Sequence, residues 1–195
     1  MKGLLTHDKG NTFKVIKQVL EDMGYSVYTE VLNANQFGVP QRRERIYIVA
    51  ILDNQEPFEF PIPLNTPTTL GDVLEDVVDD KYTLSDKLWG WLEAKKARHM
   101  AKGSSFGHTV FTNTSPFTNT ITARYYKDGA EALVAQQDKN PRKLTPREIA
   151  RLQGFPEDFK IVVSNTQVYK QFGNSVAVPV VESIASNIYK HLQNS

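Results

Sequence analysis

The run RIYIVAIL at residues 45–52 restricts the possible folds of this chain more than any other segment. It is almost continuously apolar and branched, which is typical of a strand covered on both faces. The alternating segment 25–32 predicts a second strand, and apolar spacing predicts a helix over residues 12–23. Two strands and one helix cannot close a core alone. We therefore expect a piece of a larger α/β sheet.

The rest of the chain looks less regular. Four prolines between residues 57 and 67 mark an exit from the sheet. The pattern then predicts helices over residues 84–100, 145–152 and 176–192, and strands over residues 120–126 and 132–136. The last helix would be entered through Asn174 and Ser175.

Composition excludes several classes of protein. The chain has no cysteine, so it holds no disulfide, cysteine-ligated zinc or thiol nucleophile. Its net charge of +1 means that any nucleic-acid contact has to come from local clusters. No apolar run approaches the roughly 20 residues of a membrane span, and no signal-peptide pattern is present. We expect a cytoplasmic protein without membrane contact or a metal site.

Four segments could carry chemistry, and each has a plain structural alternative. Residues 41–45 (QRRER) place arginines at a sheet edge, where they could meet a carbonyl or phosphate or simply form a solvated rim. Residues 139–151 are basic enough to bind phosphate or to be an ordinary helix surface. The polar, aromatic stretch 102–126 could read base edges or be a surface loop. Residues 173–176 (GNSV) could hold a polar ligand or only cap a helix.

Three of these four segments overlap longer, distinctive stretches of sequence. They are NANQFGVPQRRERIYIVA at residues 33–50, RKLTPREIARLQGFP at residues 142–156 and QFGNSVAVPV at residues 171–180. In this order they resemble motifs VIII, IX and X of DNA (cytosine-5) methyltransferases. Thr120 and Ile121 match the Thr-aliphatic dipeptide of the target recognition domain, which the family places between motifs VIII and IX. The middle part is most similar to bacterial Dcm-like methylases of CCWGG sites.

The resemblance implies an α/β fold: the C-terminal fragment of a Rossmann-like S-adenosylmethionine-dependent methyltransferase domain plus a small, mostly β target recognition domain. Residues 1–54 would end the catalytic domain, residues 55–164 would form the recognition domain with motif IX, and residues 165–195 would carry motif X and a helix returning to the catalytic domain. The family's Gly-rich, Pro-Cys and Glu-Asn-Val motifs are not in this sequence. We expect a split subunit, a gene fragment or a truncated form.

In this family, a cysteine thiolate adds to C6 of a flipped cytosine and a glutamate assists at N3, after which C5 takes the methyl group from S-adenosylmethionine. The resemblance implies that Arg45 would donate to O2 of that cytosine. Arg43 would support Arg45, and Gln41 would shape the loop behind them. Preorganised donors of this kind are worth roughly 3 kcal/mol.

The resemblance also implies ligand contacts elsewhere. A pocket for S-adenosylmethionine, with its main wall in the N-terminal half of the enzyme, would be completed by Asn174, Ser175 and Val176. Contacts to DNA would come from Thr120, Ile121, Arg124, Arg142 and Lys143.

The expected partners are double-stranded DNA and the N-terminal half of the methyltransferase. Without that half, the apolar face of the last helix (Val180, Val181, Ile184, Ile188) would be exposed, and the chain could self-associate. Two alternatives stay open. One is an autonomous sequence-specific DNA-binding module without catalysis, and the other is a gene remnant with no activity.

Overall fold

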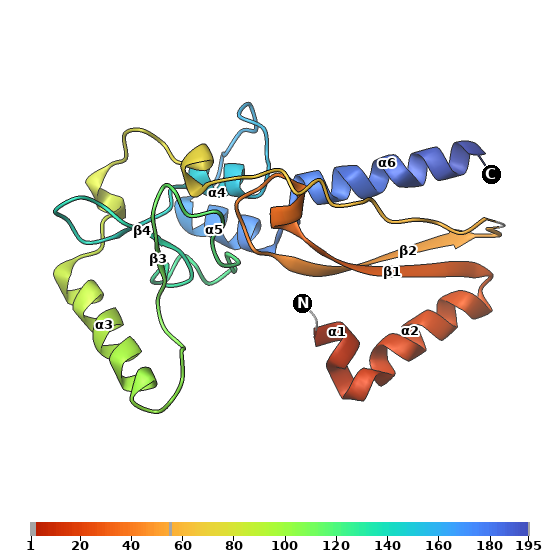
Figure 1. Ribbon diagram of the computed structural model, residues 1–195, viewed down its shortest axis with the longest axis horizontal. Helices are drawn as coiled ribbons and strands as arrows, with labels where there is room; N and C mark the ends of the chain where they lie inside the picture. Colours follow the sequence, from red (N-terminus) through yellow and green to blue (C-terminus); the bar gives the residue numbers. More distant parts are fainter. Residues whose placement is uncertain (1–2, 55, 195) are drawn as a thin grey trace.

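The computed structural model describes residues 3–54 and 56–194 (Figure 1). Its α-helices and strands follow one another in this order: α1 Gly3–Thr6, α2 Asn11–Asp22, β1 Tyr25–Asn33, β2 Glu44–Leu52, α3 Asp86–Met100, β3 Val110–Phe111, β4 Leu133–Val134, β5 Arg142–Lys143, α4 Pro146–Leu152, α5 Asn165–Asn174 and α6 Val178–Asn194. Four short 3-10 helices lie between them, at His7–Gly10, Ala34–Phe37, Leu70–Val73 and Asp80–Tyr82.

The long hairpin of β1 and β2 forms one lobe with α1, α2 and α6, which we call the hairpin lobe. The two strands pair antiparallel from Tyr25 opposite Leu52 to Asn33 opposite Glu44. Figure 1 shows α6 along one side of the hairpin and α2 on the other. The core between hairpin and α6 contains Leu32, Val49, Phe58, Val180 and Ile184.

The other side of the hairpin lobe is open. The structure places no residue of α2 in a buried position, and Val15 and Val19 on this helix are 61% and 52% exposed. In β2, only Val49 is buried. Strand β2 is thus covered on one face and only partly covered on the other, which agrees with a strand from a piece of a larger sheet. The physical reason is that the face turned away from α6 has no complete layer packed over it.

A second lobe is built from α3, the small sheet β3-β4-β5, α4 and α5, and it closes its own core. β3 runs parallel to β4, and β5 runs antiparallel to β4. The core side chains come from widely separated segments and include Leu70, Ile121, Tyr125, Leu144, Ile149, Leu152, Val168 and Phe172. Because α5 contributes Val168 and Phe172 to this core, its packing favours a domain boundary after residue 174 rather than at residue 165.

The fold confirms the predicted helices over residues 12–23, 84–100 and 145–152 and the two long strands, each within a few residues. The predicted strand over residues 120–126 is wrong. That segment forms turns, because Tyr125 N bonds back to the Thr122 carbonyl and Lys127 N to the Arg124 carbonyl. Residues 132–136 contain only the two-residue strand β4. Helix α5 was not predicted.

The end of the chain also differs from the prediction. Asn174 ends α5 and Ser175 caps it, so these residues do not open the last helix, which begins at Val178. The expected exposure of the α6 face is wrong for Val180 and Ile184, which are 1% and 7% exposed. The hairpin of the same chain covers them, whereas Val181 is 38% exposed.

Candidate functional site

The loop before β2 joins the two lobes through backbone pairing. Arg42 N donates to the Thr118 carbonyl at 2.8 Å, and Thr118 N donates to the Pro40 carbonyl at 2.8 Å. Gln41 is fully buried between them. Its Nε2 donates to the Leu152 carbonyl at 3.2 Å, and its Oε1 accepts from Ile121 N at 3.0 Å. Gln41 therefore shapes this loop by bridging it to the second lobe.

Arg43 enters the junction between the lobes and does not face an open hollow. It is 3% exposed, and its terminal nitrogens donate to the carbonyls of Ile121 at 2.9 Å, Gly173 at 3.1 Å and Ser175. Burial, with a smaller contribution from Arg45, lowers the pKa of Arg43 to about 10, so it keeps its charge at neutral pH. Because its two terminal nitrogens are committed to backbone carbonyls, any support that Arg43 gives to Arg45 acts through the position of the loop.

Arg45 has a different environment. It is half-buried and lines an open hollow of about 340 Å³ together with Arg42, Glu44, Asn119 and Thr120. One terminal nitrogen donates to the Glu44 carbonyl at 2.7 Å, and burial lowers the pKa of Arg45. Arg43 and Arg45 stand at alternate positions, which would put them on one side if both belonged to a strand. The strand begins only at Glu44, so Arg43 does not follow its alternation.

Two further residues of the hollow are Thr120, which was predicted from the sequence, and Asn119, which was not. Thr120 donates through its hydroxyl to the Arg42 carbonyl at 2.7 Å, and this contact closes one side of the hollow. Asn119 lines another part, and its side chain donates to the Glu131 carbonyl at 3.0 Å. The adjacency of Asn119 to Thr120 was the only signal for it in the sequence.

The five predicted DNA-binding residues differ in accessibility. Ile121 is fully buried, and Arg142 is 6% exposed. Arg142 forms two 2.8 Å bonds to the carboxylate of Glu148, which is fully buried, so the structure contradicts DNA contact by these two residues. Lys143 is half-buried, and burial lowers its pKa. Arg124 is exposed.

Glu148 is a buried acid that the sequence argument missed as an organising residue. It accepts from Arg142, from the Thr145 backbone at 2.7 Å and from the Glu75 backbone at 2.9 Å. Thr145 and Glu148 form a reciprocal capping box at the start of α4. The Thr-Pro-Arg-Glu string is the sequence signature of such a box and could have identified it. The basic residues of this segment are therefore used partly for packing.

The predicted cofactor residues lie together at the junction between α5 and α6. The side chain of Asn174 and that of Val176 are exposed, while Ser175 donates through its hydroxyl to the Phe172 carbonyl at 2.8 Å. At the start of α6, Val178 N already donates to the Gln153 carbonyl at 2.8 Å, and Pro179 has no N–H to offer. These residues fit one edge of a ligand site, and the described residues do not enclose it.

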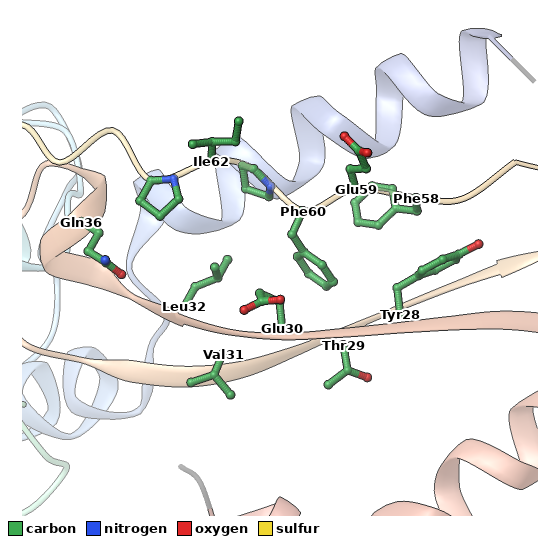
Figure 2. A pocket seen from close by; sticks show the side chains of 12 residues that line it. Tyr28, Thr29, Glu30, Val31, Leu32, Gln36, Phe58, Glu59, Phe60 and Ile62 are labelled. Atoms are coloured by element: carbon green, nitrogen blue, oxygen red, sulfur yellow. The ribbon is translucent and has the colours of Figure 1, made fainter.

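A larger hollow of about 660 Å³ lies between β1 and the extended segment 58–63. Figure 2 shows Tyr28, Leu32 and Phe60 pointing into the space between the two segments, whereas Thr29 and Val31 point away from it. Its lining includes none of the residues around Arg45. Size alone therefore does not identify the site in this molecule.

Comparison with known proteins identifies the family. The model of the C-5 cytosine-specific DNA methylases matches residues 1–190. The chain is 56% identical to type II methyltransferase M.SsoII of Shigella sonnei, over 100% of the chain and 52% of the relative. It is 53% identical to M1.ScrFI of Lactococcus lactis subsp. cremoris, over 100% of the chain and 51% of the relative. The chain therefore belongs to the C-5 cytosine-specific DNA methylase family, and it spans about half the length of these relatives.

Solved structures agree on the fold. The methyltransferase EhMeth of Entamoeba histolytica aligns with a TM-score of 0.75 at 22% identity, over 95% of this chain and 60% of that one. The Dnmt2 methyltransferase of S. pombe aligns with a TM-score of 0.78 at 22% identity, over 96% and 64%. These alignments confirm the expected methyltransferase fold over the part of it that this chain spans. Within the described residues, no helix combines the length and apolarity needed to span a membrane.

Proposed function

We propose that this chain supplies the DNA-recognition lobe and one active-site arginine of a cytosine-5 methyltransferase acting on duplex DNA. The Arg45 hollow carries this proposal. It combines a half-buried guanidinium with Thr120 and Asn119 at the boundary between the lobes. A flipped cytosine is a flat, polar ligand whose O2 can accept from such a donor.

The two arginines divide the work in this proposal. Arg43 ties the loop before β2 to the Ile121 and Gly173 carbonyls and so fixes the start of the strand. Arg45, held by its bond to the Glu44 carbonyl, donates to the O2 of the target base as negative charge develops on the ring. Thr120, with the exposed Arg124, faces the DNA around the target.

The chain needs a second polypeptide segment for the chemistry. It contains no cysteine, so the thiolate that attacks C6 has to come from the family's other half. S-adenosylmethionine supplies the methyl group when it is bound. Asn174, Ser175 and Val176 would form one edge of its site, and the principal wall would belong to the cysteine-bearing half.

The open side of the hairpin lobe is the surface on which we expect that half to dock. Val15 and Val19 of α2 and Met23, which caps the end of this helix, are more than half exposed, at 61%, 52% and 62%. Exposed apolar side chains at helical spacing favour association with another apolar surface. Self-association through the same face is the competing outcome when the other half is not available.

The proposal is tested by complementation. The chain is mixed with the cysteine-bearing half of a family member, for example the part of M.SsoII that it does not match, and methyl transfer to duplex DNA is measured. We expect activity only in the mixture, and Arg45→Met to reduce it by about 10²–10³-fold. Arg45→Lys keeps the charge but not the planar fork of donors, so its activity should lie between that of the wild type and that of Arg45→Met.

Lys190→Met is the matched control, because it removes an exposed cation near the end of α6 and should leave activity unchanged. Full activity of the Arg45→Met mixture would contradict the assigned role. Sequence-specific DNA binding without recovered methyl transfer would instead favour an autonomous DNA-binding module.

A further inference from the structure

Helix α3 carries a cationic stripe that the proposed active site does not use. We define the α3 stripe as Trp91, Lys95, Arg98, His99 and Lys102, which together line an open hollow of about 290 Å³. Steps of three and four residues place side chains on the same side of a helix, and the spacing from Trp91 to Arg98 follows this rule. Within α3 the stripe runs from Trp91 to His99, about 12 Å along the axis at 1.5 Å per residue, and Lys102 continues it in the turn after the helix.

The charge of the stripe is of one sign. Its lining contains three permanent cations and no carboxylate. In the part of the chain that the structure describes, the ion pairs involve other residues and leave Lys95, Arg98 and Lys102 unpaired. Cations in the last turn stabilise a helix through its dipole, which gives Arg98 and His99 a local role. That role explains neither Lys95, more than a turn earlier, nor the neighbouring aromatic side chains.

Two aromatic residues stand exposed beside these cations. Trp91 is 47% exposed, and Phe106, from the loop after α3, is 61% exposed. The ammonium nitrogen of Lys95 lies 4.8 Å from the Trp91 ring centroid and 5.4 Å from the Phe106 ring centroid. These are cation–π distances, so the rings hold the Lys95 side chain in a defined place while its remaining N–H groups can face outward.

A neighbouring side of α3 is anchored, which keeps the stripe in position. Leu92 packs in a small core with Leu84 and Leu133. His108 is buried against Trp89, at 4.7 Å between ring centroids, and its Nε2 lies 2.9 Å from a Glu93 carboxylate oxygen. These contacts tie the loop that carries Phe106 to α3. The stripe is therefore an ordered feature of the second lobe.

We propose that the α3 stripe binds the phosphate backbone of duplex DNA beside the target site. The inference rests on the proposed function, which already brings this polyanion to the second lobe. Duplex DNA carries one negative charge per about 1.7 Å of its axis, so a stripe of this length can meet several phosphates. Contacts to phosphate position a protein without reading sequence. The stripe would thus add affinity and orientation, and Arg124 and Thr120 would lie nearer the target base.

The test measures the salt dependence of binding to a labelled duplex of arbitrary sequence, by fluorescence anisotropy over a range of KCl concentrations. The full chain is compared with the variant Lys95→Gln/Arg98→Gln/Lys102→Gln. Each phosphate contact contributes about 0.9 to the slope of log affinity against log salt concentration. We expect the slope of the variant to be less steep by about 2 to 3. Trp91→Ala should weaken binding several-fold and leave the slope nearly unchanged.

The control Lys14→Gln/Lys160→Gln/Lys190→Gln removes the same charge from exposed positions outside α3 and should keep the wild-type slope. An unchanged slope in the stripe variant, an equal loss in the control, or no binding of duplex by the wild-type chain would each overturn the proposal. Circular dichroism at matched concentration verifies that the variants are folded. If the mixture recovers methyl transfer but the stripe variant keeps the wild-type slope, only the stripe proposal is rejected. If the stripe variant has a reduced slope but the mixture does not recover methyl transfer, only the proposed catalytic function is rejected.

Discussion

The second lobe and helix α2 show two different outcomes for apolar side chains in the same chain. In the second lobe, Leu70, Ile121, Tyr125, Ile149 and Leu152 are completely inaccessible to solvent. In α2, no described residue is buried, although the helix is clearly amphipathic in sequence. Amphipathic spacing is enough to form a helix, but burial needs a facing surface. The second lobe provides that surface itself, whereas the described part of the hairpin lobe leaves α2 without a facing layer.

The largest expected effect concerns the buried ion pair of the second lobe. Arg142→Met leaves the Glu148 carboxylate, which is fully buried, without its guanidinium partner. Removing one member of a buried pair costs about 3–5 kcal/mol, so we expect the second lobe to lose most of its stability. Both tryptophans lie on α3, so urea unfolding followed by fluorescence reports this lobe. Arg151→Met breaks the more exposed pair with Glu157 and should cost about 1 kcal/mol or less.

A pair of apolar truncations sharpens the comparison directly. Ile149→Ala opens a cavity in the closed core and should cost about 2–5 kcal/mol in the free energy of unfolding. Val19→Ala truncates an exposed side chain of α2 and should change it by about 0.5 kcal/mol or less. Equal losses in the two variants would mean that α2 is packed against the chain in solution, which contradicts the open side.

A smaller effect is expected at alkaline pH. Burial raises the pKa of Tyr125 and of Tyr169 above the ordinary value of 10.0. The unfolded chain loses these protons near pH 10 while the folded chain retains them, so stability is full below about pH 10 and falls as the pH rises above it. Tyr169 donates to the Leu144 carbonyl at 2.9 Å. Tyr169→Phe should cost about 1 kcal/mol near pH 8 and reduce the alkaline loss.

Urea unfolding midpoints measured near pH 8 and near pH 11 give the loss of stability, because these two pH values lie on opposite sides of the ordinary tyrosine pKa. The exposed Tyr189 gives a matched control, since Tyr189→Phe should leave the alkaline loss unchanged. An identical alkaline loss in wild type and Tyr169→Phe would show that Tyr169 does not contribute to it.

The sequence predicted the elements that depend on local pattern. The helices and long strands follow apolar spacing and capping, as at α4 with its Thr145 and Glu148 box. The predicted strand at residues 120–126 failed because the alternation there serves a turn, in which Ile121 and Tyr125 point into the core. Helix α5 was missed although Val168, Tyr169 and Phe172, which pack into that core, already stand at helical spacing in the sequence.

The sequence indicated arginines at the candidate site but not the directions in which their side chains point. Arg45 lines an open hollow, whereas Arg43 turns inward to three carbonyls contributed by segments far along the chain. Arg142 likewise turned out to be committed to Glu148. A basic residue in a sequence shows its charge, but its partner depends on tertiary contacts that no local pattern contains.

Hydrogen exchange of α2 in the presence of the cysteine-bearing half tests the central claim most directly. We measure exchange of the amides of Asn11–Asp22 in the chain alone and in the mixture. We predict fast exchange in the chain alone and strong protection in the mixture, with little change at Ile149 and its neighbours in the closed core. Unchanged exchange of α2 in a mixture that methylates DNA would contradict the claim that its open face receives the catalytic half.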